Sequence, residues 1–409
     1  MITAQLTNNN FLQIDDETSR RLVAGAVDSQ RVSGLTHNFY RYPARFSPVF
    51  ANSVINTFTK PGDFVFDPFM GGGTTLVEAT AAGRKAAGTD ISSLAAFVTQ
   101  VKTTPLKDAD LYALSKWANE LVGKLNIHQN VSDDGDCDQR YKRNLHSKET
   151  WRIKKLIEQA IATTPGLHFI KRRDFARCVI LRTSQWALDG RKRIPNASQF
   201  RSRLADTAHE MIEASRSYSR EVRLQFGDNG QNEIVKCFHS AVDKFDFASV
   251  IDQFGAPKLV LTSPPYPGVR VLYHRWQVNG RRETPAPFWI ANKPDSAGAP
   301  YYTMGDQKQR GLTTYYSNIE SSFAALSPQL AASSIVVQMV AFSNPSWQLG
   351  QYLKTMNKAG FVELKLPQLA RVQDGRLWRD VPNRKWHAYQ KGPTSGSREV
   401  MLFHRPKAD

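Results

Sequence analysis

Two segments of the sequence share one layout, a short apolar run that stops at a sharp turn. Residues 64–66 are followed by Asp-Pro-Phe-Met and three glycines at 67–73, and residues 259–262 are followed by Ser-Pro-Pro-Tyr at 263–266. Short apolar runs bounded by glycine or proline are typical of buried strands. A helical pattern and a second strand pattern follow the glycines, so the first run opens a βαβ unit. We therefore expect an α/β fold with a doubly wound, mostly parallel, Rossmann-like sheet.

The rest of the chain divides into a helical middle part and strands on either side of it. Helical patterns dominate between residues 107 and 230, which predicts a mostly helical insertion. Strand patterns resume after it, and 361–366 with 398–403 are expected to form a terminal antiparallel pair. The predicted organisation is an N-terminal arm over 1–33, an α/β domain over 34–106 and 231–409, and the insertion over 107–230.

The charge of the chain suits a polyanionic partner. The net charge is +17 at pH 7, and residues 139–226 alone hold 20 Lys and Arg against 8 Asp and Glu. A basic excess gathered in one region is typical of nucleic-acid binding. The alternative is a basic enzyme whose charge only aids solubility.

Several classes are excluded by what the sequence lacks. No window approaches the roughly 18 apolar residues that span a bilayer, and the N-terminus has no secretory pattern. We therefore expect a cytoplasmic protein with no membrane partner. Cys137, Cys178 and Cys237 are scattered without CxxC spacing, which predicts neither a disulfide framework nor a metal site.

The glycine turn at 71–73 permits a ligand to approach the backbone closely. Its spacing is not GxGxxG, and no phosphate-loop lysine follows, so a purely structural turn is the alternative. Asp90 ends the next predicted strand, where an acid in such folds binds ribose hydroxyls. A nucleoside cofactor without phosphate fits this pattern, which favours S-adenosylmethionine. Asp67 would then lie near its ammonium group, Asp90 on the ribose and Ile91 against the adenine.

The tetrapeptide at 263–266 offers acceptors for an amino group. The Ser263 hydroxyl and the Pro264 carbonyl could both accept from an exocyclic NH₂, and the prolines fix the direction of that carbonyl. Tyr266 would supply a ring face for an unstacked base. The alternative is a structural Pro-Pro turn. Methylation at a ring carbon would need a cysteine nucleophile, usually after proline, and no cysteine here has that context.

Taken together, the two motifs resemble those of the DNA amino-methyltransferases, most closely the N4-cytosine group, because serine opens the tetrapeptide. Residues 39–46 are similar to the aromatic motif that closes over the methionine end of the cofactor. The resemblance implies a seven-stranded methyltransferase sheet with an antiparallel terminal strand. It also implies S-adenosylmethionine as cofactor and everted bases of double-stranded DNA as substrate. The implied catalytic residues are Ser263, Pro264, Pro265 and Tyr266. The implied cofactor-binding residues are Phe39, Tyr40, Arg45, Asp67, Pro68, Phe69, Gly71, Gly72, Gly73, Thr74, Asp90, Ile91 and Ser240.

An everted base must be stabilised by contacts to the surrounding DNA. Basic residues interleaved with aromatic ones suit phosphate contacts and base stacking, whereas a solvated face is the alternative for each run. The residues predicted to contact DNA are Lys171, Arg172, Arg173, Arg191, Arg193, Arg270, Tyr273, Arg275, Trp276, Arg281, Arg376, Trp378 and Arg384.

The predicted function is a site-specific methyltransferase that forms N4-methylcytosine in double-stranded DNA. Adenine-N6 methylation is the first alternative, since both amines present similar geometry. RNA or protein amide methylation is another, although asparagine usually opens the tetrapeptide there. A nucleic-acid-binding protein with a vestigial cofactor pocket is the alternative outside catalysis. A cognate restriction endonuclease or other defence proteins are possible partners.

Overall fold

A twisted sheet forms the centre of one half of the molecule. The computed structural model describes residues 5–6, 11–30, 32–42, 46–129, 139–228, 233–267, 275–278, 280, 282–295, 304–305, 309–366, 374–380 and 398–407. The sheet has eight strands, in the order β10-β12-β9-β6-β3-β4-β5, with β11 paired to β12. These strands are β3 (Phe64–Asp67), β4 (Lys85–Asp90), β5 (Val235–His239), β6 (Leu259–Thr262), β9 (Ile335–Ala341), β10 (Phe361–Leu364), β11 (Leu377–Asp380) and β12 (Arg398–Pro406).

The direction of the strands confirms the predicted doubly wound sheet. β3 is parallel to both β4 and β6, β4 is parallel to β5, and β6 is parallel to β9. β12 is antiparallel to β9, β10 and β11, and it is the expected antiparallel terminal strand. The chain builds outward from β3 in one direction and then returns to build from β6 in the other. Ligands of such sheets bind at the carboxyl ends of the strands where this reversal occurs.

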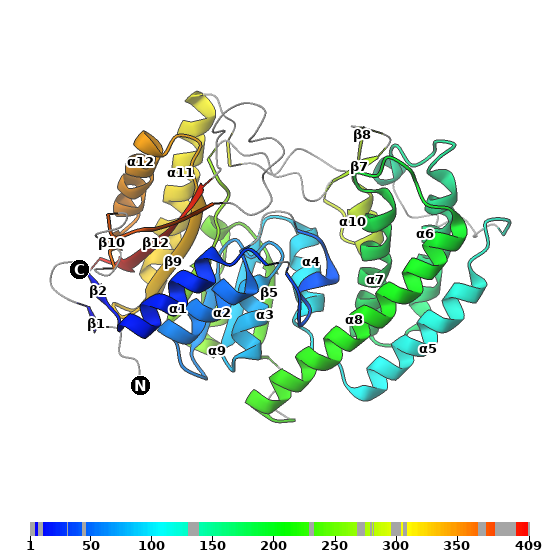
Figure 1. The fold of residues 1–409 in the computed structure, drawn as a ribbon, viewed down its shortest axis with the longest axis horizontal. Coiled ribbons are helices and arrows are strands. Elements are labelled where there is room, and N and C mark those ends of the chain that lie inside the picture. Colours follow the sequence, from blue (N-terminus) through cyan, green and yellow to red (C-terminus); the bar gives the residue numbers. More distant parts are fainter. Residues whose placement is uncertain are drawn as a thin grey trace.

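Helices cover both faces of the sheet (Figure 1). The strand residues alternate, so Val65 packs towards one face, and Phe64 and Phe66 towards the other. The Val65 face carries α1 (Asp16–Val27), α2 (Pro48–Phe58) and α3 (Thr74–Ala81). The opposite face carries α9 (Ala248–Phe254), α11 (Gln309–Leu326) and α12 (Pro345–Lys358).

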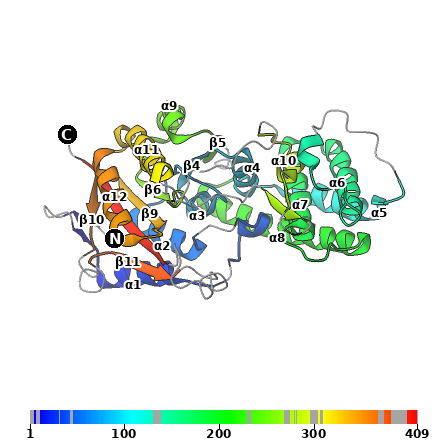
Figure 2. The ribbon, with the colours of Figure 1, turned by 90° about the horizontal axis from the view of Figure 1, so that it is seen from above.

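A helical unit occupies the other end of the molecule (Figures 1 and 2). It contains α5 (Asp108–Lys124), α6 (Trp151–Thr163), α7 (Ile170–Leu188) and α8 (Ala197–Phe226). Its core continues onto α4 (Ser93–Lys102), which packs against β4 and β5. The long helix α8 also reaches α3, where the Tyr218 and Thr80 hydroxyls are 2.7 Å apart. The helical unit and the sheet are therefore joined by α4 and α8.

Several elements differ from the predicted ones. The hairpin of β7 (Trp276–Val278) and β8 (Arg282–Thr284), together with α10 (Ala286–Ala291), packs against α7, although the predicted boundary put this segment outside the insertion. Helix α11 was not predicted, whereas α7 lies in the segment predicted to be mostly helical but was not located individually. Because α7 is buried on most of its circumference, it has no apolar stripe to recognise.

Some expectations concern smaller details. The sequence pattern over 241–254 predicts one helix, whereas the structure has a 3₁₀ turn at Val242–Lys244 followed by α9. Near the N-terminus, β1 (Gln5–Leu6) pairs with β2 (Leu12–Gln13) ahead of α1. A surface loop expected at 133–136 lies outside the described residues. Among the described helices, none combines the length and apolar character that a bilayer crossing requires.

Candidate active site

The two predicted turns meet at one edge of the sheet. Asp67 is the last residue of β3, and Thr262 is the last residue of the neighbouring parallel strand β6. Thr262 Oγ1 donates a hydrogen bond of 2.7 Å to Asp67 Oδ1. On the other side of β3, Asp90 ends β4. The glycine turn after Asp67 and the tetrapeptide after Thr262 therefore leave the sheet side by side.

The backbone of the glycine turn is held by several internal contacts. The Gly71 and Gly73 residues have φ angles of +46° and +74°, which favour glycine. A Cβ on Gly73 would lie 2.6 Å from Thr99 Cγ2, and one on Gly72 would lie 3.1 Å from Tyr42 Cβ. A Cβ on Gly71 would have the Phe69 carbonyl oxygen, 3.9 Å away, as its nearest neighbour. Packing within the protein thus accounts for Gly72 and Gly73, whereas a Cβ on Gly71 would make only ordinary van der Waals contacts.

Two carboxylates at this edge are poorly compensated. Burial raises the pKa of Asp67 to about 6, although hydrogen bonds from Thr262, Thr75 and the Phe69 amide oppose that shift. Burial also raises the pKa of Asp90, against hydrogen bonds from the Ser92 amide at 2.8 Å and the Gly71 amide at 3.0 Å. Within the described residues, neither carboxylate is paired with lysine or arginine. A positively charged ligand at this edge would supply the missing charge.

The other predicted cofactor residues surround this edge unevenly. Ile91 follows Asp90 and is 42% exposed, so its side chain is accessible to a ligand. The Ser240 amide donates to the Asp90 carbonyl at 3.0 Å, which sets the end of β5 beside that of β4. Residues Pro68, Gly72, Gly73 and Thr74 are buried and Phe69 is partly buried.

The aromatic segment does not lie as predicted. Phe39 is buried against Phe175 of α7, with ring centroids 5.6 Å apart. The Tyr40 hydroxyl accepts a hydrogen bond of 3.0 Å from Trp276 Nε1. Both rings therefore belong to the core of the helical unit, because large aromatic side chains gain most from full burial. Tyr42, another residue of the predicted aromatic segment 39–46, lies beside the glycine turn. Arg45 lies outside the described residues.

The tetrapeptide is tied to the terminal strands. Ser263 Oγ lies 3.0 Å from the Met339 carbonyl of β9 and 3.4 Å from the Tyr266 hydroxyl. The Tyr266 hydroxyl donates to Glu399 Oε1 of β12 at 2.5 Å. Burial and the neighbouring Glu399 raise the pKa of Tyr266 well above its ordinary value. Pro264 is buried and Pro265 partly buried.

Glu399 and its partner Arg379 were not predicted as site residues. Arg379 of β11 reaches Glu399 Oε2 through both Nε and Nη2, each at 2.6 Å. Arg379 directly follows Trp378, which was predicted to contact DNA. Its strand forms by pairing with β12, and no local pattern in the sequence indicates that contact.

Several residues predicted to contact DNA are engaged within the protein. Lys171 and Arg172 both form ion pairs with the buried Asp110. Trp276 is fully buried, so its ring offers no free face to a base. These placements correct the prediction, because a cation paired with a buried carboxylate and a fully buried ring are not free to contact DNA.

The remaining residues predicted to contact DNA differ in their burial and in their partners within the protein. Arg376 forms a two-pronged ion pair with Glu363, at 2.6 and 2.8 Å. Arg275 is buried 3.8 Å from Glu283, and Trp378 lies beneath the guanidinium of Arg398. Arg173 is partly exposed. Arg270, Tyr273, Arg281 and Arg384 lie outside the described residues.

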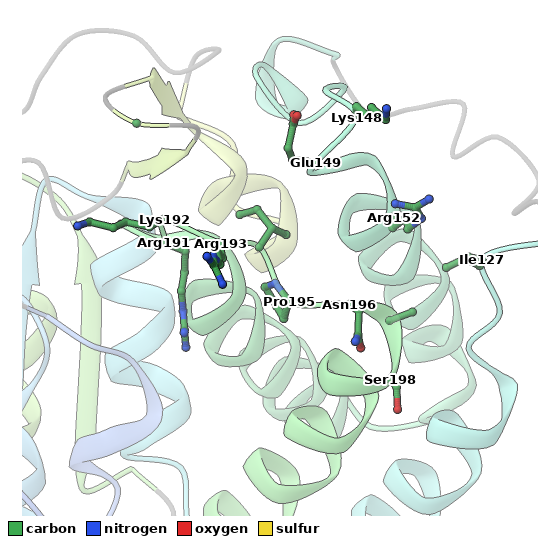
Figure 3. Close-up of a pocket in the computed structure, with 14 residues that line it drawn as sticks. Ile127, Lys148, Glu149, Arg152, Arg191, Lys192, Arg193, Pro195, Asn196 and Ser198 are labelled. Atoms are coloured by element: carbon green, nitrogen blue, oxygen red, sulfur yellow. The ribbon is translucent and has the colours of Figure 1, made fainter.

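A basic cleft opens in the helical unit (Figure 3). Its volume is about 1220 Å³, and its walls come from the segment that begins α6 and from the loop between α7 and α8. Glu149 is an acid in this wall. The basic residues of the cleft, all exposed and none in an ion pair within the described chain, are Lys148, Arg152, Arg191, Lys192 and Arg193. Of the predicted contacts, Arg193 keeps its charge open to a ligand. The guanidinium of Arg191 lies over the Trp186 ring and donates through Nε to the Trp186 carbonyl at 2.8 Å.

The sheet order, its antiparallel terminal strand and the glycine turn after β3 define a doubly wound, Rossmann-like fold. Residues 17–98 match the family model described as DNA methylase. Over this segment the chain is therefore similar to the DNA amino-methyltransferases. The matched segment contains the glycine turn and Asp90 but not the tetrapeptide.

Curated relatives match over similarly short stretches. The type II methyltransferase M.MvaI of Kocuria varians is 41% identical over 80 residues, 19% of this chain and 18% of its own. M.MjaII of Methanocaldococcus jannaschii, also a type II methyltransferase, is 31% identical over 99 residues, 24% of this chain and 18% of its own. The orphan methyltransferase M.BamHII of Bacillus amyloliquefaciens is 45% identical over 53 residues, 13% of this chain and 20% of its own. The matches thus span about a fifth of each relative's length.

A solved structure is similar only at a distance. The rRNA methyltransferase aviRa from Streptomyces viridochromogenes aligns over 90% of this chain and 88% of its own, at 11% identity and a TM-score of 0.29. A likeness of this size supports no statement about function.

The similarity to DNA methylases and the Rossmann-like fold imply S-adenosylmethionine as the methyl donor, and the edge of the sheet fits it. The donor carries a sulfonium and an ammonium group, and Asp67 and Asp90 are carboxylates that lack a lysine or arginine partner among the described residues. Gly71 has a φ of +46°, and a Cβ on it would overlap no protein atom, so packing alone does not require glycine there. Asp67 and Asp90 are the residues that would hold the donor.

Proposed function

We propose that this protein is an S-adenosylmethionine-dependent DNA methyltransferase that forms N4-methylcytosine in double-stranded DNA. The observation that carries the proposal is the hydrogen bond from Thr262 to Asp67. It joins the turn suited to a cationic nucleoside donor with the turn suited to an amino group. The serine that opens the tetrapeptide favours cytosine N4 over adenine N6, as the resemblance implies.

The proposed transfer is a direct displacement. Bound S-adenosylmethionine supplies an electrophilic methyl group. Asp67 and Asp90 hold the donor, and their uncompensated charges favour a cation. The Ser263 oxygen and the Pro264 carbonyl accept from the N–H groups of the substrate amine, which orients its nitrogen lone pair towards the methyl carbon. Transfer would form the nitrogen–carbon bond and break the carbon–sulfur bond, so that the donor leaves as a neutral thioether, and the surplus amine proton would pass to solvent.

The target base has to leave the duplex to reach Ser263, at a cost of a few kcal/mol. We assign the contacts that offset this cost to the helical unit, through the open cations of the basic cleft. Phosphate contacts from such cations stabilise a nucleic-acid complex without reading its sequence. The division into an arm over 1–33, a catalytic domain over 34–106 and 231–409, and a DNA-binding insertion over 107–230 remains part of the proposal.

The test of this function is chemical. The protein is incubated with S-adenosylmethionine and double-stranded DNA of mixed sequence, and the DNA is then digested to nucleosides and analysed by mass spectrometry. We expect N4-methylcytosine, and none with Ser263→Ala. N6-methyladenine would instead establish the adenine alternative. Absence of any methylated nucleoside, with the donor bound, would favour a DNA-binding protein with a vestigial pocket.

A further inference from the structure

The Tyr266 hydroxyl is held by a buried acid that comes from the other end of the chain. Tyr266 Oη lies 2.5 Å from Glu399 Oε1, and the two residues are 133 positions apart. Glu399 is 6% exposed, and the guanidinium of Arg379 contacts its second oxygen through Nε and Nη2. Arg379 in turn donates through Nη1 to the Ala26 carbonyl, 2.9 Å away in the last turn of α1.

This chain of contacts decides which way the Tyr266 hydrogen points. A guanidinium only donates, so the Glu399 carboxylate that faces Arg379 only accepts. Tyr266 must then donate its hydrogen to Glu399. The Tyr266 oxygen keeps lone pairs for any other neighbour, and it can only accept from that neighbour.

The Ser263 hydroxyl also donates its hydrogen to a group of the protein. Its oxygen lies 3.0 Å from the Met339 carbonyl and 3.4 Å from the Tyr266 oxygen. Both neighbours are acceptors for its hydrogen, and the shorter contact is the stronger one. Each hydroxyl of the tetrapeptide therefore directs its hydrogen to a fixed group of the protein and leaves lone pairs free.

Such a pair matches an exocyclic amine, which presents N–H donors. A hydroxyl that donated to the amine nitrogen would occupy the lone pair that has to attack the methyl group. A hydroxyl that only accepts leaves this lone pair free and draws on the N–H groups.

We infer that Glu399 and Arg379 are positioning residues for the transfer step, which fix the Tyr266 hydroxyl as an acceptor. They act through Tyr266 and do not contact the substrate. The inference rests on the proposed function, since it concerns the same amino-group site. It adds two residues from β12 and β11 to the requirements of that site.

A double-mutant cycle tests the inference. Tyr266→Phe, Glu399→Gln and the double variant are compared at saturating donor and DNA. We expect each single variant to lower kcat about tenfold or more with little change in donor affinity, the size of one lost oriented hydrogen bond. The double variant should be no slower than the slower single variant, because Glu399 acts through the Tyr266 hydroxyl. Additive losses would overturn the inference.

A second comparison separates positioning from stability. Glu399→Gln leaves the Arg379 charge buried and unpaired, so it also lowers the melting temperature. Adding Arg379→Gln removes that charge, and we expect the melting temperature to recover while kcat stays low. Recovery of kcat together with stability would show a merely structural pair and overturn the inference. Glu363→Gln, which breaks the Arg376 pair on the neighbouring strand β10, is the matched control and should keep kcat.

The activity of the wild-type protein shows whether the inference alone or the proposed function has failed. If it methylates DNA and Glu399→Gln has the same kcat, the inference alone is wrong. If the wild-type protein transfers no methyl group to DNA, the proposed function is wrong and the inference falls with it.

Discussion

Thr262 Oγ1 donates a 2.7 Å hydrogen bond to Asp67 Oδ1, from the last residue of β6 to the last residue of β3. The bond favours the charged form of Asp67, whereas burial raises the pKa of this acid to about 6. The residue next to Ser263 thus helps to keep a negative charge at the proposed donor site. A shift of the tetrapeptide that moved Thr262 would therefore also change the pKa of Asp67.

Replacing Thr262 by valine keeps the shape of the side chain and removes the hydrogen bond. The pKa of Asp67 should rise further, and the affinity for S-adenosylmethionine at pH 7 should fall about tenfold, since a hydrogen bond to a charged group contributes about 1.5–3 kcal/mol. Titration calorimetry measures this affinity. Thr80→Val, which removes a buried hydroxyl that contacts Tyr218, is the control. Equal affinities in all three proteins would contradict the role of Thr262.

The glycines of the turn should respond differently to alanine. Gly73→Ala places a Cβ 2.6 Å from Thr99 at a φ of +74°, so we expect a loss of about 2–4 kcal/mol of stability from backbone strain and overlap together. Gly71→Ala meets no close atom, so strain alone should cost about 1–2 kcal/mol. Urea unfolding measures both values. A similar loss in the two variants would show that packing against Thr99 is not what requires glycine at position 73.

The strand ends that carry the candidate site could be predicted because short local sequence patterns indicate them. The glycine turn, Asp90 and the tetrapeptide each follow a short apolar strand, and carboxyl ends of parallel strands share one edge of a sheet. Knowing that β3 and β6 are such strands was enough to expect Asp67 and Ser263 near each other. The roles given to these residues remain predictions.

Other parts depend on contacts that no local pattern encodes. Glu399 meets Tyr266 through the register of β12 against β9 and β11. Trp276 looks like a residue for stacking on a base, but its indole pairs with Tyr40, 236 positions earlier. Lys171 and Arg172 look like an open basic run, and only the fold brings Asp110 beside them.

The buried charge of Asp67 should lower the free energy of unfolding, and a neutral residue at this position should raise it again. The pKa of Asp67 is about 6 in the folded protein against an ordinary value of 3.8, so the unfolded chain ionises first as the pH rises. The folded state therefore loses stability between about pH 4 and 6 and stays less stable above that range. Asp67→Asn should be more stable than wild type at pH 7.5, by up to about 3 kcal/mol.

The pH dependence makes this prediction specific. Urea unfolding of wild type and Asp67→Asn should give curves that converge as the pH falls from 6 towards 4, where both side chains are neutral. Donor binding should be lost in the variant, and in wild type it should weaken below about pH 6 as Asp67 takes up a proton. A stability difference that is the same at pH 4.5 and 7.5 would exclude the buried charge as its cause.

Cations of the basic cleft and cations paired within the protein should differ in their effect on DNA binding. Arg193 lines the cleft and has no ion pair among the described residues, whereas Lys171 is paired with Asp110. Arg193→Ala and Lys171→Ala each remove one positive charge. A cation in contact with phosphate contributes about 0.9 to the slope of log K against log salt.

We therefore expect Arg193→Ala to reduce that slope by about one and to weaken binding to every DNA sequence alike, while Lys171→Ala leaves the slope unchanged. Fluorescence anisotropy with a labelled duplex at several salt concentrations measures the slope, and melting temperatures check that both variants are folded. A reduced slope in Lys171→Ala with none in Arg193→Ala would move the DNA from the cleft to the start of α7. Equal reductions in both would mean that long-range net charge, and not contact within the cleft, governs the binding.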